Sequence, residues 1–284
     1  MTTLALVLVL TAAVCHASWN FLAKRVHGGA ELVWLYSTLS SVLYLPLAVW
    51  IFWQADSFSL QQLLFIGGSA VLHLFYFVLL QAGYRHGDLS LVYPTARSMG
   101  PLVAMVLAAI ALAEYPTLQG AIGAAIIIGG VFALTGGGRR AGGNATTSLL
   151  FGLGVGLLIG SYTTWDAYAV ATLAVPPLLM DYGANLGRGL LLWPTAIRRR
   201  SLIVQHWRNH RTEVIGIAIL SPLAYILVLY AMSFTPVAYV APLREVSVLL
   251  AVLAGSLLLN EGHLRFRLSW AAVILVGVVT LATS

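Results

Sequence analysis

Charged side chains are scarce in this chain of 284 residues. Asp, Glu, Lys and Arg make up only 8% of it, whereas 60% of the residues are hydrophobic. A soluble globular domain typically carries about 25% charged residues, so this chain cannot cover a surface that faces water. No hydrophilic stretch is long enough to form a separate soluble domain. The composition therefore predicts an all-α polytopic membrane protein that works within the bilayer.

Cysteine is nearly absent, and the phosphate-binding loop of ATP-driven proteins is missing from the sequence. The single cysteine, Cys15, excludes an intramolecular disulfide framework and a multi-cysteine metal site. Without a Walker-type loop, ATP is not the direct driver. We expect no metal and no other cofactor. The run 2–23 superficially resembles a signal peptide, but it lacks a basic leader, and we interpret it as the first membrane helix.

Apolar runs of about 20 residues recur along the chain, which is the length that a hydrocarbon core of about 30 Å requires. Backbone groups in lipid must be hydrogen-bonded internally, so each run predicts a helix. The polar alternation of a membrane barrel does not occur. The ten predicted transmembrane helices span residues 2–23, 31–53, 61–83, 88–112, 117–136, 148–170, 172–194, 212–234, 236–259 and 266–283.

Positive charge falls on alternate connections. All but three of the 15 Lys and Arg residues follow an odd-numbered predicted helix, and none lies in an even-numbered connection or at a terminus. Positive loops stay in the cytoplasm, so we expect both termini on the outer face of a bacterial inner membrane. The net charge of +6 then reflects topology and not a nucleic-acid partner. The basic run 197–211 also suits anionic lipid headgroups.

An internal repeat relates the two halves of the chain. Ser18-Trp19-Asn20 matches Thr164-Trp165-Asp166, Tyr76 falls on Tyr225, and Pro94 falls on Pro242, at a nearly constant offset. Each copy holds five predicted helices, and an odd number requires the second copy to insert from the opposite side. We therefore predict two inverted five-helix repeats at 1–138 and 147–284, joined by a cytoplasmic linker at 139–146. In secondary transporters with inverted repeats, the substrate site lies at the midplane between the copies.

A family resemblance accompanies the repeat. In the segment 101–131, a Pro-Leu pair leads to Glu114 and then to a helix that ends in Gly-Val. This segment resembles the fourth and fifth helices of EamA-type proteins in the drug/metabolite transporter superfamily. The paired tryptophans Trp19 and Trp165 also suit that family, and the resemblance covers essentially the whole chain. Within the superfamily the chain looks most like the YddG-type exporters, which have ten helices and export aromatic amino acids among others.

Aromatic side chains with a polar group occur at two depths. Those near the ends of the predicted helices suit membrane anchors, and we assign this role to Trp34, Tyr36, Trp50, Trp53 and Trp193. Deeper ones need a partner for their N–H or O–H group, so they tend to face the protein interior or a wet cavity. Helix packing and substrate contact are both open for the deep set, which comprises Trp19, Tyr76, Tyr93, Tyr162, Trp165, Tyr225 and Tyr239.

Polar side chains within membrane helices are costly and are functional candidates by default. Arg97 and Glu245 occupy equivalent positions in the two copies, and we hypothesise that they pair, either as a gate or substrate clamp or as a static link. Asp181 and Arg188 share a helix face, which favours pairing along that helix or with a neighbour. Other such residues are His16, Asn20, His73, Asp166 and Arg244.

From these two sets we predict a substrate site and a gate. The site comprises Trp19, Asn20, His73, Tyr76, Tyr93, Arg97, Tyr162, Trp165, Asp166, Tyr225, Tyr239, Arg244 and Glu245. Proline kinks a helix because it removes a backbone hydrogen bond, and we predict gating at Pro94, Pro101 and Pro242. Gly152, Gly156 and Gly160 are spaced for close helix packing and not for chemistry.

The resemblance and these residues predict a secondary transporter that exports amino acids by alternating access, and we expect it to be a monomer. Aromatic amino acids fit the aromatic lining best, and other small neutral metabolites also fit. The first predicted helix contains no acidic residue, which favours facilitated export, although Asp166 could carry a proton. The alternative is proton-coupled efflux of cationic drugs. A lipid-modifying enzyme is disfavoured because His206 and His210 lack an acidic cluster, and a pure scaffold would not need so many deep polar aromatics.

The predicted topology can be tested by labelling. Cysteines introduced at Lys24 and Arg140, with Cys15 changed to Ser, should both react with an impermeant maleimide only after the cytoplasmic face is exposed. Both positions follow odd-numbered helices and share one face in the predicted arrangement. Reaction of the two positions from opposite faces would contradict the helix count.

Overall fold

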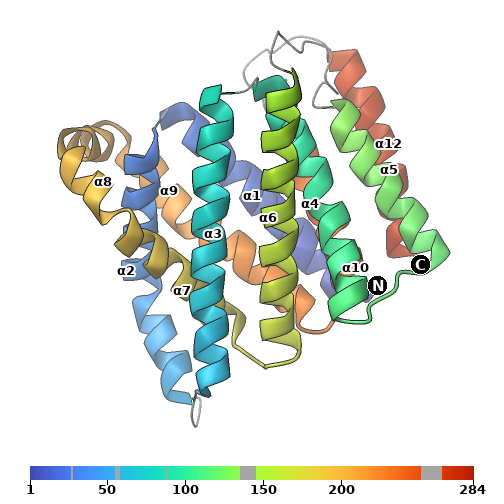
Figure 1. The fold of residues 1–284 in the computed structure, drawn as a ribbon, viewed down its shortest axis with the longest axis horizontal. Coiled ribbons are helices and arrows are strands. Elements are labelled where there is room, and N and C mark those ends of the chain that lie inside the picture. Colours follow the sequence, from blue (N-terminus) through green and yellow to red (C-terminus); the bar gives the residue numbers. More distant parts are fainter. Residues whose placement is uncertain (27, 55–57, 87–88, 135–144, 251–263) are drawn as a thin grey trace.

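The computed structural model describes residues 1–284 except 27, 55–57, 87–88, 135–144 and 251–263, and the described part is helical apart from turns and short connections (Figure 1). Its helices are α1 (Thr3–Val26), α2 (Ala30–Gln54), α3 (Leu60–His86), α4 (Leu89–Ala111), α5 (Leu118–Leu134), α6 (Ala145–Ala171), α7 (Pro177–Leu191), α8 (Trp193–Arg198), α9 (Arg200–Met232), α10 (Val237–Arg244) and α12 (Leu264–Ala282).

Six of the described helices are long and apolar enough to cross a membrane: α1, α2, α3, α4, α6 and α9. Helices α5 and α12 are also apolar but shorter. Large apolar side chains such as Leu60, Leu64 and Ile110 are exposed on the outside of the bundle. An apolar exterior of this extent suits lipid and not water. The chain is therefore a multi-pass membrane protein with an all-helical fold.

The observed helices follow most of the predicted runs, with three departures. Run 236–259 is interrupted, because α10 ends at Arg244. Run 172–194 is divided, because α7 ends at Leu191 and the short α8 begins at Trp193. The basic segment 197–211, expected to be a connection, is helical apart from Arg199: it ends α8 at Arg198 and forms the first part of α9 from Arg200, with a kink at His210 (φ −136°, ψ 31°). Exposed arginines alternate in this segment with exposed apolar residues such as Trp207. The hydropathy of the segment is therefore low, although the segment is helical. Run 236–259 and the linker 139–146 extend into residues outside the described part.

Figure 1 shows the helices running alternately up and down. The C-terminal ends of α1 and α3 lie toward the upper end of the view, as does α8, while both chain termini lie toward the lower end. The basic residues at these helix ends therefore gather at one end of the bundle, as the alternating charge of the connections predicts. An ion-pair cluster joins elements there: Glu31 at the start of α2 accepts a hydrogen bond from Arg199 at 2.8 Å and lies 3.7 Å from His206.

The connection between α4 and α5 reaches the beginning of α10. Glu114 in that connection accepts a hydrogen bond from the backbone N–H of Val237, at 2.7 Å. The first N–H groups of a helix lack partners within the helix, so this carboxylate satisfies one of them. Burial raises the pKa of the Glu114 carboxyl above its usual value, against the opposing effect of the hydrogen bond.

Glycine allows two pairs of helices to approach closely. A Cβ atom at Gly152 would lie 2.7 Å from Cβ of Thr95, and one at Gly156 would lie 2.5 Å from Cβ of Met99, so α6 packs tightly on α4. This confirms the packing role predicted for these glycines. At Gly123 the approach is to backbone: a Cβ there would lie 2.6 Å from the Leu281 nitrogen, which makes α5 and α12 a second close pair.

Substitution of Gly123 tests the second contact. Gly123→Ala should lower the melting temperature of the detergent-purified protein by several degrees, because overpacking costs about 1–3 kcal/mol and the neighbouring backbone cannot rotate away. Gly129→Ala on the same helix is the matched control, since a Cβ there meets nothing within 4 Å. Equal melting temperatures for the two variants would contradict the close α5–α12 packing.

Candidate functional site

A cavity of about 280 Å³ lies inside the bundle. Its walls come from α1, α2, α3, α4, α6, α7, α9 and α10, and no described residue of α5 or α12 lines it. The lining is mixed, with aromatic, charged and small apolar side chains. Its polar and aromatic members are His16, Trp19, Asn20, Tyr36, His73, Tyr76, Phe77, Tyr93, Arg97, Tyr162, Asp181, Arg188, Ser221, Tyr225 and Arg244.

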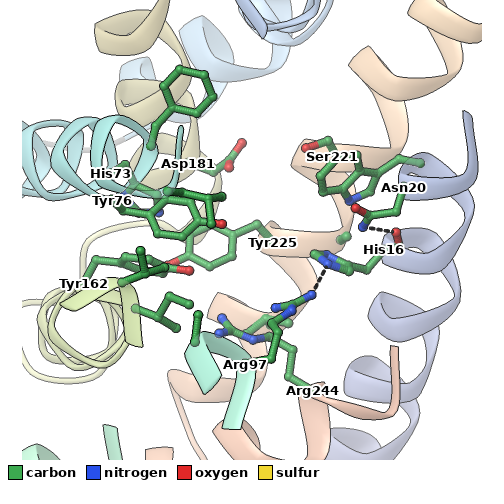
Figure 2. A pocket seen from close by; sticks show the side chains of 18 of the residues that line it. His16, Asn20, His73, Tyr76, Arg97, Tyr162, Asp181, Ser221, Tyr225 and Arg244 are labelled. Atoms are coloured by element: carbon green, nitrogen blue, oxygen red, sulfur yellow. Dashed lines mark hydrogen bonds between the residues drawn. The ribbon is translucent and has the colours of Figure 1, made fainter. Parts of the chain in front are cut away.

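Four rings from three helices form an aromatic wall, which we define as His73, Tyr76, Tyr162 and Tyr225 (Figure 2). His73 stacks on Tyr162 with their centroids 4.1 Å apart, and Tyr76 meets Tyr162 edge-on at 5.6 Å. Tyr225 also lies edge-on to His73, at 5.6 Å. The mutual contacts fix the ring positions, so the wall presents a preformed aromatic surface to the cavity.

A charged cluster closes another side of the cavity. Glu245 is only 1% exposed, and its Oε1 lies 3.6 Å from Arg97 and 4.0 Å from Arg244. Arg97 also donates a hydrogen bond to His16 Nε2 at 2.9 Å, and it lies over the ring of Tyr93. The predicted pairing of Arg97 with Glu245 is therefore confirmed. A gate or clamp role for the pair stays a prediction.

Asp166 lies behind the aromatic wall and not in the cavity lining. Its Oδ2 accepts a hydrogen bond from the Tyr225 hydroxyl at 2.6 Å, whereas its fully buried Oδ1 has no partner among the described residues. The carboxylate therefore contacts the cavity only through Tyr225. This position fixes the Tyr225 ring, because a hydrogen bond to a carboxylate is stronger than one between neutral groups.

Asp181 and Arg188 line the cavity from α7, but they do not form the direct pair that their shared helix face favoured. Seven residues along a helix span about 10 Å. Asn185 lies between them and donates a hydrogen bond to Asp181 Oδ2 at 2.8 Å. Arg188 forms no ion pair with a described residue, and its buried Nε has no hydrogen-bond partner.

Nine residues of the predicted site line the cavity: Trp19, Asn20, His73, Tyr76, Tyr93, Arg97, Tyr162, Tyr225 and Arg244. Asp166 and Glu245 stand directly behind it, bonded or paired to lining residues. Trp165 and Tyr239 lie elsewhere. Trp165 stacks on Phe65 at 4.1 Å and donates to the Phe65 carbonyl, and the Tyr239 hydroxyl accepts from the backbone N–H of Thr117. Their polar groups are satisfied by helix packing, so these two positions are corrections to the predicted site.

Six polar or aromatic lining residues were absent from the predicted site: His16, Tyr36, Phe77, Asp181, Arg188 and Ser221. His16, Asp181 and Arg188 were noted in the sequence as polar residues within membrane helices but were not assigned to the site. Tyr36, assigned to the membrane interface from its place near a helix end, is instead 7% exposed and faces the cavity. Phe77 and Ser221 carry no signal in the sequence, because Phe and Ser occur throughout such helices. Among the predicted gating prolines, Pro101 lies in α4 and Pro242 in α10, both buried, while the side chain of Pro94 is outside the described residues.

A bundle of apolar helices around a polar cavity is the architecture of a membrane transporter. The comparison with family models agrees: the EamA-like transporter family matches twice, over residues 3–136 and 146–283. The chain belongs to the EamA-like transporter family, within the drug/metabolite transporter superfamily. Members of this family are typically not enzymes, and the described residues include no group of His, Cys, Asp and Glu that could hold a metal ion.

Two further comparisons concern individual proteins. No curated protein matches the sequence significantly. Solved structures share the fold, and one of them, titled only as the crystal structure of a protein, superposes with a TM-score of 0.74. That alignment covers 100% of this chain and 98% of the other at 14% identity, so it shows the fold alone.

The shared carboxylate of Glu245 gives a testable contrast. Glu245→Gln should lower the melting temperature strongly, because it leaves two buried guanidiniums without their counter-charge, and breaking a buried pair costs about 3–5 kcal/mol. Glu213→Gln is the control, since its pair with Arg25 is solvent-exposed on the arginine side and such pairs contribute less than about 1 kcal/mol. Similar melting temperatures for both variants would show that Glu245 is not needed as a counter-ion.

Proposed function

We propose that this protein is a secondary transporter that exports amino acids across the bacterial cytoplasmic membrane by alternating access. The observation that carries the proposal is the cavity, whose lining combines guanidiniums, a carboxylate and an aromatic wall. Pockets for small molecules combine apolar and aromatic walls with a few placed polar groups. A volume of about 280 Å³ suits one small metabolite.

The chemistry of an amino acid matches the polar groups of the cavity. Guanidiniums bind carboxylates in two-pronged hydrogen bonds, and the cavity offers Arg97, Arg188 and Arg244 for this purpose. Asp181 can accept hydrogen bonds from an ammonium group. The aromatic wall provides stacking and edge-on contacts for the side chain, and aromatic amino acids use them most fully.

The proposed transport cycle uses ten helices in two inverted repeats, with both termini on the outer face. Supporting this, α1 and α6 begin the two segments that match the family, and they run in opposite directions in Figure 1. Residues from both segments line the cavity, as expected for a site between repeats. We propose that the molecule works as a monomer, because one chain supplies the whole cavity.

Facilitated export is favoured over proton-coupled efflux of cationic drugs. Among the described residues, three guanidiniums and one carboxylate line the cavity, and the carboxylates of Glu245 and Asp166 lie behind the lining. A cation that enters the cavity therefore meets more positive than negative groups at its surface. Helix α1 contains no acidic residue. Asp166 remains the candidate proton carrier for the alternative, and it reaches the cavity only through Tyr225.

Flux into proteoliposomes tests the proposal. The purified protein should carry radiolabelled tryptophan, methionine or threonine down its gradient, at similar rates with and without a pH gradient. Arg97→Gln should reduce this flux at least tenfold, because Arg97 lines the cavity and orders its charged cluster. The matched control is Arg208→Gln on the exposed face of α9, which should transport normally.

Absence of flux for every amino acid tested would overturn the proposed substrate class. Flux of a cationic drug that collapses without a pH gradient would favour the alternative instead. Both outcomes require that the protein remains monodisperse after reconstitution, which size-exclusion chromatography of the solubilised proteoliposomes checks.

A further inference from the structure

The charges that face the cavity do not balance. Three arginines line it, one each from α4, α7 and α10, whereas Asp181 is its only lining carboxylate among the described residues. Two further carboxylates lie behind the lining: Glu245 is near Arg97 and Arg244, and Asp166 is hydrogen-bonded to the Tyr225 hydroxyl, whereas Arg188 has no ion pair with a described residue. In a space of low dielectric constant, an uncompensated guanidinium is costly. The cavity therefore favours a cargo that brings negative charge with it.

The arginines Arg97 and Arg244 are only loosely neutralised. Both approach the same oxygen of Glu245, at 3.6 and 4.0 Å. These distances exceed the range of about 2.7–2.9 Å that is typical of strong charged hydrogen bonds. The other oxygen, Oε2, receives no hydrogen bond within the described part of the chain. Five N–H groups on each guanidinium thus leave donors that a carboxylate in the cavity can take up.

Arg188 is a separate anion-binding group. Its guanidinium has no hydrogen bond or ion pair with another described residue, and its Nε is fully buried. It shares the cavity face of α7 with Asp181, which is held in place by Asn185. A carboxylate acceptor and a guanidinium donor on one helix face complement the ammonium and carboxylate of a zwitterion.

The two charged regions lie apart. Figure 2 shows Asp181 on one side of Tyr225, with Arg97 and Arg244 on the other side. In this view Tyr225, one member of the aromatic wall, lies between them. A neutral amino acid can satisfy only one of these regions at a time, because its two charged groups are attached to the same carbon atom.

We propose that the preferred cargo is an amino acid with a second carboxylate in its side chain, and this rests on amino-acid transport as the proposed function. The α-ammonium and α-carboxylate bind Asp181 and Arg188, the stem of the side chain lies along the aromatic wall, and the second carboxylate binds Arg97 and Arg244. The net charge of −1 on the cargo then compensates the positive excess of the lining.

Isosteric pairs of substrates test this charge requirement. Counterflow in proteoliposomes compares glutamate with glutamine, and 4-carboxyphenylalanine with phenylalanine, since each pair differs mainly in the second carboxylate. The native protein should transport the charged member at least tenfold faster at low concentration. Glutamate should also raise the melting temperature of the detergent-purified protein more than glutamine does.

Two variants assign the carboxylates to the two regions. Arg244→Gln leaves Arg97 neutralised by Glu245 and supplies an amide, so the ratio of glutamine to glutamate transport should rise above 1, whatever the total rate of the variant. Arg188→Gln removes the partner of the α-carboxylate, which glutamate and glutamine share, so both should lose transport. A reversal of preference cannot come from a general loss of stability.

The possible failures are distinct. Equal transport of glutamate and glutamine by the native protein overturns the charge requirement and leaves amino-acid export standing. Absence of transport for all four compounds, and for tryptophan, methionine and threonine, overturns both proposals. Equal stabilisation by chloride or inorganic phosphate and by glutamate, together with an unchanged preference in Arg244→Gln, shows that an inorganic anion balances the arginines and overturns the inference.

Discussion

The fold depends on one buried charge, the carboxylate of Glu245, which the helix bundle shields from water. Glu245 is nearly fully enclosed, and it lies between Arg97 of α4 and Arg244 of α10. Removing such ions from water costs several kcal/mol each, which only their mutual attraction offsets. Helices α4 and α10 come from the two different segments that match the family. Their contact therefore joins the two halves of the chain directly beside the cavity.

Most of the fold follows from hydropathy, because lipid requires long apolar helices and the positive-inside rule fixes the alternation of their ends. The departures have a common cause. The segment 200–211 folds as a helix with arginines on its exposed surface, and a scan for apolar runs cannot distinguish such a helix from a polar loop. The break between α7 and α8 at Leu192 is also invisible to a scan for apolar runs, because the residues on both sides of it are apolar.

The candidate site was less predictable than the fold. The repeat identified the Arg97–Glu245 pair, because equivalent positions on crossing helices with opposite charge have few other ways to be neutralised. The same repeat misplaced Trp165. It is the sequence equivalent of Trp19, yet its indole stacks on Phe65 and bonds to a backbone carbonyl. Sequence equivalence carries no information on which neighbours fill a space, and Tyr36 near the end of α2 could be assigned to the cavity only from coordinates.

The contact at Gly123 has a consequence for how the molecule can move. Helices α5 and α12 meet there backbone to backbone, and neither contributes a described residue to the cavity. With no side chain between them at Gly123, the two helices have little freedom to slide past each other at that point. In the proposed transport cycle, α5 and α12 would therefore move as one unit, and the rearrangements that open the cavity would involve the eight helices that line it.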